Sequence, residues 1–325
     1  MRRAAYVVFG NTGYLVAAIG DFMEPHPRAE MDRRADTFDP MLERPTRRRR
    51  RMWREVRGGR RRNRRDALPA GWEDVTEAAV VHWELLDEGE RAELGELMEL
   101  LVRTKRWEAA RGFVLTDEIR VVIAAQASLL VLGLDIGYYR AVSSIIVHPT
   151  TMTLRGVRPG PAAGVVTDAP LAILGQAQHQ RGPVVIAWDA ARTDARHPER
   201  GHNVVFHEFA HKLDMLDDVV DGTPPLPDHT ARERWIEVCT AEYRLLRAGG
   251  GGYLLRNYAM VNPGEFFAVA TEVFFDVPGE LLAQKPALYG VLRDFYRQDP
   301  ARREQLSATR LGGKPPGDFG AGGRA

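Results

Sequence analysis

Apolar residues recur every three or four positions in several long segments of the chain, which is the spacing of amphipathic helices. Residues 90–102 form one such segment, and a second follows Thr116, which can cap a helix that ends at Gly133. The same spacing returns in residues 232–247, in a segment that begins near Pro263, and in one or two helices within residues 276–298. The pattern therefore predicts a mostly helical protein.

Runs of β-branched residues are few and short. Residues 143–149 are predicted to be a strand, and residues 183–189 a buried strand. Residues 171–177 are predicted to be an edge strand, whose free backbone suits pairing with an extended peptide. Residues 107–113 and 190–201 are predicted to be connections. Many helices with a few strands indicate the α+β class.

Residues 204–214 carry the pattern His-Glu-x-x-His on a segment with helical spacing, and Asn203 suits its N-cap. His207 and His211 lie one turn apart on one face, where both imidazoles can reach one metal ion. Glu208 lies beside that ion and can take a proton from water. Such a match arises by chance in about one chain in a hundred of this length. A second interpretation therefore stays open, in which the histidines are hydrogen-bonded residues of a core helix.

A third ligand is available from the helix that begins near Pro263. Glu265 and Glu272 are seven positions apart, so they share one helical face, and that face can point at the two histidines. A carboxylate beside two imidazoles completes a zinc site with three protein ligands and an open fourth position. The alternative for Glu265 is an acid favoured by the dipole of its helix N-terminus.

Composition limits the other classes of site. The 325 residues are 44% hydrophobic, which suits a globular core. A single cysteine, Cys239, excludes an intramolecular disulfide and a cysteine-based zinc site, and its place on an apolar stripe indicates a core residue. The net charge of +1 is unevenly distributed: residues 46–65 carry twelve arginines and one glutamate, so by difference the rest carries −10.

Charge and composition also predict the domain organisation. Residues 1–66 are predicted to be a disordered, Arg-rich extension, residues 67–306 the folded domain that carries the His-Glu-x-x-His pattern, and residues 307–325 a disordered Gly-rich tail. The arginines could contact nucleic acid through its phosphates. The alternatives are a tail without function and a start codon assigned too far upstream. No aromatic platform or base-reading motif accompanies the arginines, among which Trp53 stands alone. Nucleic-acid binding is therefore not expected except through this Arg-rich segment.

The first 20 residues place two arginines before an apolar run, as a signal peptide does. Asn11, Thr12 and several glycines interrupt that run, which is also short for a membrane span. We therefore expect a cytoplasmic protein without a membrane partner, with secretion or membrane anchoring as the alternative.

The motif in residues 207–214, followed by the spacing of Asn, Pro, Glu and Phe in residues 262–275, resembles the Mlc titration factor A family of bacterial zinc metallopeptidases. That family is similar to the catalytic domain of anthrax lethal factor. The resemblance covers residues 68–305. It implies a zincin-like α+β domain, mostly helical, with a small mixed β-sheet beside the motif helix.

The resemblance also implies the roles of individual residues. Zinc, one ion per chain, would be held by His207, His211 and Glu265. Glu208 would be the general base in the hydrolysis of a peptide or protein substrate, with activity of the aminopeptidase type.

Further positions match the family's pattern. Tyr258, seven residues before Glu265, would stabilise the reacting carbonyl oxygen, while Asp214 and Glu272 would orient the metal ligands. Family members also bind the Mlc repressor of sugar-uptake genes. A protein that sequesters such a repressor around a structural zinc site is therefore a further alternative to a peptidase.

Overall fold

The computed structural model describes residues 68–310, apart from positions 111, 155–157, 160–165, 168–170, 174, 178–181, 218 and 251. The extension predicted at residues 1–66 and the tail from residue 311 lie outside the described residues, and so do the predictions of disorder made for them. The boundary predicted at residue 306 falls within a helix, because the last helix extends to Arg310.

Helices make up most of the described chain, which confirms the predicted helical character. The α-helices are α3 (Trp72–Ala79), α4 (His82–Leu85), α5 (Glu88–Thr104), α6 (Asp117–Leu130), α7 (Trp188–Asp194), α8 (Val204–Asp214), α9 (His229–Arg247), α10 (Pro263–Asp276), α11 (Pro278–Gln284), α12 (Pro286–Tyr296) and α13 (Pro300–Arg310). The 3-10 turns are η2 (Ile136–Tyr139), η3 (Pro198–Arg200), η4 (Met215–Asp217) and η5 (Asn257–Met260). The strands are β1 (Arg106–Ala109), β2 (Ser144–His148), β3 (Met152–Leu154), β4 (Arg158–Pro159), β5 (Val166–Thr167), β6 (Leu171–Ile173), β7 (Gly175–Ala177) and β8 (Val184–Ala187).

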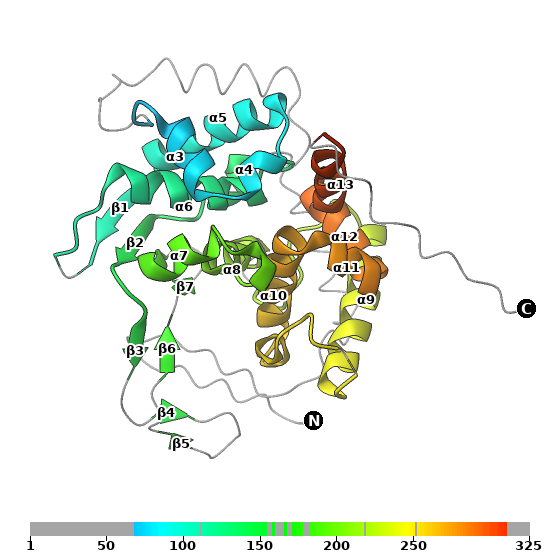
Figure 1. Cartoon of the computed structure of the whole chain (residues 1–325). Helices are drawn as coiled ribbons and strands as arrows, with labels where there is room; N and C mark the ends of the chain where they lie inside the picture. The colour runs from blue at the N-terminus through cyan, green and yellow to red at the C-terminus, as the bar shows by residue number, and fades with distance from the viewer. Residues whose placement is uncertain are drawn as a thin grey trace, which may run out of the picture.

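A small four-stranded sheet in the order β1-β2-β8-β7 lies beside α8 (Figure 1). Strands β1, β2 and β8 are parallel, and β7 pairs antiparallel with β8 at the edge. All four residues of β8 are buried, as its continuous apolar run predicts. The α+β prediction is therefore correct, and the predicted edge strand divides into β6 and β7.

Two segments predicted to be connections have regular structure. Residues 106–109 form β1, where Arg106 and Glu108 flank Trp107 and leave no apolar run to recognise, as is typical of edge strands. Within residues 190–201, the chain continues the helix α7 as far as Asp194. That prediction was wrong because α7 is short and carries mostly polar residues. The last residue of α7, Asp194, is nevertheless buried. Its Oδ2 accepts a 2.9 Å hydrogen bond from Val204 N at the start of α8.

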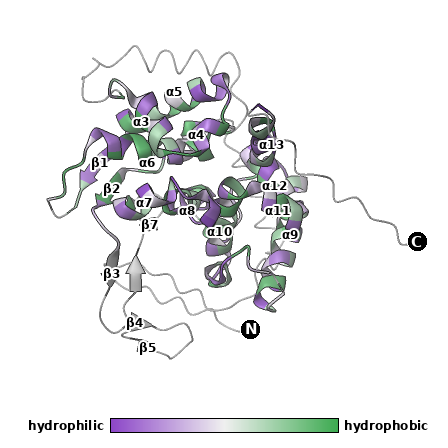
Figure 2. Ribbon diagram, viewed as in Figure 1, coloured by the Kyte–Doolittle hydropathy of each residue, from purple (hydrophilic) through white to green (hydrophobic). Residues whose placement is uncertain are grey.

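The interior of the protein is built on α6, α8 and α10. Helix α8 packs against both of the others, and every one of its residues except His211 is buried. Figure 2 shows hydrophobic residues concentrated along α6, and nearly all of α10 is buried as well. Because α8 and α10 are enclosed, their polar side chains need hydrogen-bond partners within the protein or in a ligand.

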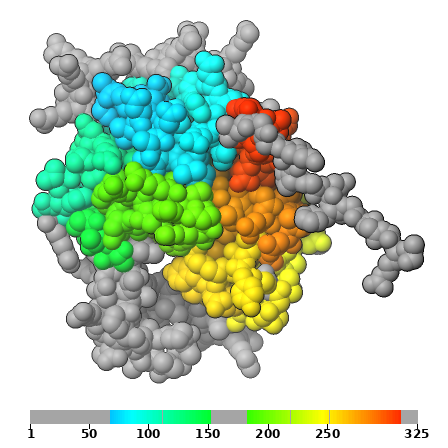
Figure 3. Space-filling view, viewed as in Figure 1, coloured from blue at the N-terminus to red at the C-terminus, as the bar shows by residue number. Residues whose placement is uncertain are grey.

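The last helix packs against the first helices of the described chain. Figure 3 shows α13, in red, against the blue N-terminal helices. Arg303 of α13 donates to Glu90 of α5 at 2.7 Å, which fixes this contact. Among the helices of the described residues, none combines the length and the apolar character needed to cross a bilayer.

Candidate metal centre

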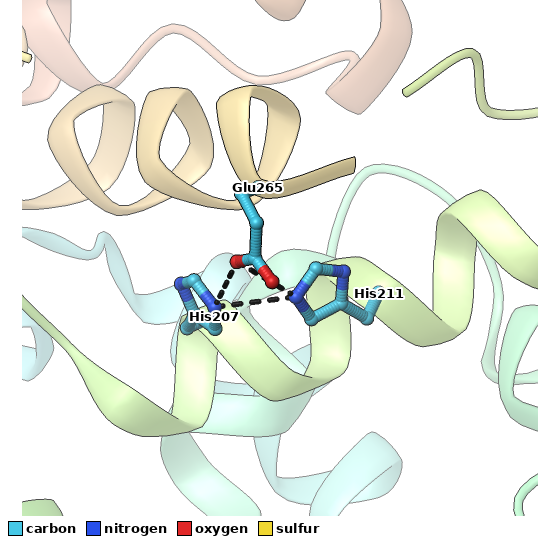
Figure 4. Close-up of side chains that lie close together, drawn as sticks. All are labelled: His207, His211 and Glu265. Atoms are coloured by element: carbon cyan, nitrogen blue, oxygen red, sulfur yellow. Dashed lines mark hydrogen bonds and ion pairs between the residues drawn. The ribbon is translucent and has the colours of Figure 1, made fainter. Parts of the chain in front are cut away.

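The start of α8 determines which way its histidines point. Asn203 is the N-cap, and its Oδ1 accepts hydrogen bonds from Val205 N and Phe206 N, both at 3.0 Å. This capping agrees with the prediction from sequence. With the first turn fixed and the apolar side chains of α8 buried in the core, His207 and His211 are directed towards α10 (Figure 4).

The start of α10 positions the carboxylate. Asn262 caps this helix through a 2.9 Å hydrogen bond from Glu265 N to its Oδ1, and Pro263 occupies the first turn, as predicted. A Cβ added to Gly264 would lie 3.1 Å from Val220 Cγ1 and 3.3 Å from Asp214 Oδ2, so this turn lies close against its neighbours. The Glu265 side chain therefore extends from a first turn of α10 whose position is fixed by these contacts.

Three side chains meet between the two helices (Figure 4). Glu265 Oε2 lies 3.0 Å from His207 Nε2 and 3.4 Å from His211 Nε2, and the two Nε2 atoms are 3.2 Å apart. Ligand atoms bound tetrahedrally at zinc distances lie roughly 3.3 Å from one another. Among the described residues this is the one group of histidine, cysteine and acidic side chains spaced to hold a metal ion.

The hydrogen bonding of these atoms also suits a metal ion. Glu265 Oε2 is buried and approaches both imidazoles, yet it makes no hydrogen bond of acceptable geometry. The Nε2 atoms of His207 and His211 face each other 3.2 Å apart, so only one of them can donate a proton in that contact. Two nitrogens and one oxygen that converge on one point are the donor set that zinc takes. The residues present therefore fit the metal that the sequence pattern predicts.

Glu272 fixes the tautomer of His207. Its Oε1 accepts a 2.7 Å hydrogen bond from His207 Nδ1, which leaves the Nε2 lone pair directed at the metal cluster. Its Oε2 accepts a 2.7 Å hydrogen bond from Asn203 N. Burial raises the pKa of Glu272, but His207 and Arg256 outweigh burial, so that the pKa is lowered. The orienting role predicted for Glu272 has a direct contact to support it.

Arg256 belongs to the same group of side chains, although nothing in the sequence indicated it. Its Nη1 and Nη2 donate to the two oxygens of Glu272 at 3.0 and 2.6 Å. Its Nη2 also lies 3.4 Å from His207 Nδ1. Arg256 precedes η5 and lies 16 positions from Glu272, so helical periodicity could not have found it.

The electrostatics of His207 follow from these neighbours. Burial lowers its pKa, but Glu272 and Glu265 outweigh burial and raise the pKa to about 10 in the absence of metal. The same contacts hold the pKa of Glu265 well below its usual range, despite burial. A metal ligand must be a neutral imidazole, and with His207 neutral the charges of Glu265 and Glu272 are opposed by Arg256 alone, which favours a bound cation.

Glu208 lies next to the cluster and is buried, with no hydrogen-bond partner for its Oε2 among the described residues. Burial raises its pKa, and His207 and His211 partly oppose that effect. Lys212 is buried one turn along and its charge acts on Glu208. An unpartnered carboxylate of raised pKa is suited to accepting a proton.

Tyr258 lies at the open side of the cluster and is about half exposed. Its hydroxyl donates to Glu265 Oε1 at 3.4 Å, and its ring centroid is 5.9 Å from that of His207. Burial of its hydroxyl and the charge of Glu265 raise its pKa, so the hydroxyl stays protonated. Tyr258 is thus a hydrogen-bond donor beside the cluster.

Asp214 differs from the other predicted site residues. It is buried at the end of α8, and its Oδ2 accepts a 3.1 Å hydrogen bond from Gly222 N in the following loop. Its Oδ1 and the Nδ1 of His211 both lack hydrogen-bond partners among the described residues, so the two side chains do not hold each other. The orienting role predicted for Asp214 has no contact to support it.

A histidine pair from a His-Glu-x-x-His helix and a carboxylate from a second helix are the arrangement typical of a metallopeptidase site. Comparison with known proteins agrees with that class. Residues 50–297 match the family described as "Glucose-regulated metallo-peptidase M90". The chain therefore belongs to this family.

Individual relatives support the assignment. "Uncharacterized protein slr2042" of Synechocystis sp. is 34% identical over 236 residues, which are 72% of this chain and 86% of that protein. "Mlc titration factor A" of Edwardsiella ictaluri is 34% identical over 226 residues, which are 67% of this chain and 84% of that protein. The Salmonella typhi protein of the same name is 30% identical over 236 residues, 71% and 85% of the two chains. The resemblance seen in the sequence motifs is confirmed.

Proposed function

We propose that this protein is a zinc-dependent peptidase of the aminopeptidase type, with His207, His211 and Glu265 as the metal ligands. The observation that carries the proposal is the set of separations of 3.0, 3.2 and 3.4 Å between the three ligand atoms. These separations fit one tetrahedral ion. Membership of a metallopeptidase family agrees with this chemistry. The aminopeptidase type is what the family resemblance implies.

Zinc, when bound, supplies a Lewis acid that lowers the pKa of water and polarises a carbonyl group. Glu208 accepts the proton of the water that attacks the peptide carbonyl, because its Oε2 is buried and free of other partners. It then passes the proton to the leaving amine. Glu272 keeps the Nδ1–H of His207 engaged, so His207 presents its Nε2 to the cluster throughout.

Tyr258 stabilises the negative charge that develops on the carbonyl oxygen. Its raised pKa keeps the hydroxyl protonated, and its long 3.4 Å contact with Glu265 is readily exchanged for one with the substrate. An extended peptide is proposed to pair with the edge strand β7, which lies next to α8.

The proposal is tested by Glu208→Gln and Glu265→Ala, with the exposed Glu237→Gln of α9 as the matched control. Glu208→Gln should keep one zinc per chain but lower kcat by roughly 10²–10⁴-fold, since it removes the general base. Glu265→Ala should lose both zinc and turnover. The measurements are zinc content and release of a chromogenic amine from an amino-acid amide. A Glu208→Gln protein with the turnover of wild type would exclude this mechanism.

A second candidate function is binding to a transcriptional repressor, because several relatives carry the name "Mlc titration factor A". Such a role also requires cytoplasmic localisation, which cell fractionation tests. Repressor binding that survives in Glu208→Gln would separate this role from catalysis. Binding by a wild-type protein that holds zinc but turns over no peptide would instead favour a structural metal site.

A nucleic-acid role through the Arg-rich segment rests on charge alone, since residues 46–65 lie outside the described residues. Deletion of residues 1–66 should leave peptidase activity intact. Equal DNA affinity before and after the deletion would dismiss this role.

A further inference from the structure

Arg256 contacts both sides of the candidate metal centre from outside the two helices that build it. On one side its guanidinium binds both oxygens of Glu272, at 3.0 and 2.6 Å. On the other side its guanidinium carbon lies 5.9 Å from the centre of the Tyr258 ring, within the range of a cation–π contact. One side chain thus connects the carboxylate behind His207 with the tyrosine at the open side.

We propose that Arg256 is a positioning residue of the metal centre, which fixes the direction of the His207 imidazole through Glu272 and the place of the Tyr258 hydroxyl through its ring face. This inference rests on the proposed function, because it assigns Arg256 a part in that zinc-peptidase site. Arg256 itself touches neither the reacting atoms nor a bound metal.

The first part of the inference concerns Glu272 and His207. A bidentate pair with arginine allows a carboxylate little freedom to rotate, so Glu272 Oε1 stays 2.7 Å from His207 Nδ1. Glu272 is fully buried, and a buried carboxylate without a cation would be costly to keep ionised. Without Arg256, Glu272 would hold His207 less firmly, and the affinity for zinc should fall.

The second part concerns Tyr258. The ring is about half exposed, so core packing does not fix it. Among the described residues the aromatic and cation–π contacts of its ring are with His207 and Arg256, at 5.9 Å each. Arg256 lies two positions before the tyrosine, and its main chain is anchored by the buried Leu255 and by a 2.9 Å hydrogen bond from Ala259 N to Arg256 O. A fixed guanidinium can therefore limit the positions that the Tyr258 hydroxyl reaches.

Lysine would not replace this arginine. An ammonium group is a point charge that can bind one oxygen of Glu272, whereas the planar guanidinium binds both and presents a flat face to an aromatic ring. Arg256→Lys should therefore keep the charge but lose the geometry. Arg256→Met should lose both and keep the bulk of the side chain.

The experiment compares Arg256→Met and Arg256→Lys with Arg234→Met as the control. Arg234 is also paired with a carboxylate, Asp294, at 2.7 Å, but on the exposed surface. Zinc dissociation constants are measured by competition with a chelator, independently of activity, and kcat and KM are measured on an amino-acid amide. Arg256→Met should weaken zinc binding about tenfold and lower kcat with little change in KM. The zinc affinity and kcat of Arg256→Lys should lie between those of Arg256→Met and wild type. Both values should be unchanged in the control.

Double variants distinguish positioning from a general loss of stability. If Arg256 acts through Glu272, Arg256→Met combined with Glu272→Gln should bind zinc no more weakly than Glu272→Gln alone. If it acts through Tyr258, Arg256→Met should lower kcat much less in a Tyr258→Phe protein than in wild type, once each is saturated with zinc. The inference would be overturned if the losses of zinc affinity were additive for Arg256 and Glu272, and the losses of kcat were additive for Arg256 and Tyr258. Zinc affinity and kcat within about twofold of wild type in both Arg256 variants would also overturn it.

Failure of the proposed function would give a different result. In that case wild-type protein itself would bind no zinc, or Glu208→Gln would keep its turnover. If Arg256→Met is too unstable to purify, Arg256→Lys carries the same comparisons. A wild-type level of zinc affinity and kcat in Arg256→Lys would then count against the inference.

Discussion

The two buried acids of α10, Glu272 and Asp276, lie one helical turn apart in opposite surroundings. Glu272 accepts hydrogen bonds from a backbone amide, from His207 and from Arg256, and its pKa is lowered. Neither oxygen of Asp276 makes a hydrogen bond within the described residues, although His82 Nε2 lies 3.1 Å from Oδ1. Burial raises the pKa of Asp276 to about 7.

This difference in surroundings shows which end of α10 stabilises an ionised carboxylate. A buried carboxylate stays ionised only where cations or several donors compensate for lost water. Glu272 has that compensation on the side that faces α8 and the metal cluster. Asp276, at the last turn beside α4, has a single histidine. Of these two acids, α10 therefore stabilises the charge of the one that contacts a candidate metal ligand, while the pKa of the other is raised to about 7.

Among the substitutions that test this contrast, the largest expected effect on zinc affinity comes from Glu272→Gln. The amide cannot accept from His207 and both nitrogens of Arg256 at once, and it leaves the guanidinium partly unpaired. Zinc affinity should fall by about 10–100-fold, up to roughly 2.7 kcal/mol. Chelator competition measures this, with the exposed Glu237→Gln as control. Unchanged affinity would mean that the contact with His207 Nδ1 has no part in metal binding.

Asp276→Asn should affect stability and its pH dependence, and leave zinc affinity near that of wild type. Since the folded-state pKa of Asp276 is raised, its contribution to stability is present at low pH and is lost as pH rises towards about 7. The asparagine variant does not lose stability in this way, because its side chain does not titrate. Its stability relative to wild type should therefore increase by on the order of 2 kcal/mol between pH 5 and pH 7.

Urea unfolding of the metal-free proteins at both pH values measures this difference, with the exposed Asp74→Asn as control. A constant difference between variant and wild type would show that Asp276 does not titrate in this range. A fall in zinc affinity as large as that of Glu272→Gln would remove the contrast between the two ends of α10.

Much of the cluster was predictable because its spacing is local. His207 and His211 are four positions apart on a segment whose apolar stripe predicts a helix, so their shared face follows from the sequence. Glu265 and Glu272 share a face of α10 for the same reason, and both contact His207 in the structure. Helical periodicity is enough to predict which residues of one helix share a face.

What could not be predicted depends on contacts between distant segments. Arg256 lies in a stretch without periodicity, and its partner His207 is 49 positions away. Strand β1 was missed because its pairing with β2 depends on residues 38 positions further along, as in the register of Arg106 with Ser144. Asp214 was assigned an orienting role on resemblance alone, and the geometry of its side chain is set by a loop that local spacing does not describe.

Asp214→Asn should have the smallest effect of the series. Burial raises the pKa of Asp214 well above its usual range, and an asparagine resembles the neutral form that burial favours. The asparagine oxygen can still accept from Gly222 N, as Oδ2 does now at 3.1 Å. Zinc affinity should therefore change by less than about threefold, against the 10–100-fold expected for Glu272→Gln. A loss of tenfold or more would mean that Asp214 supports His211 as Glu272 supports His207.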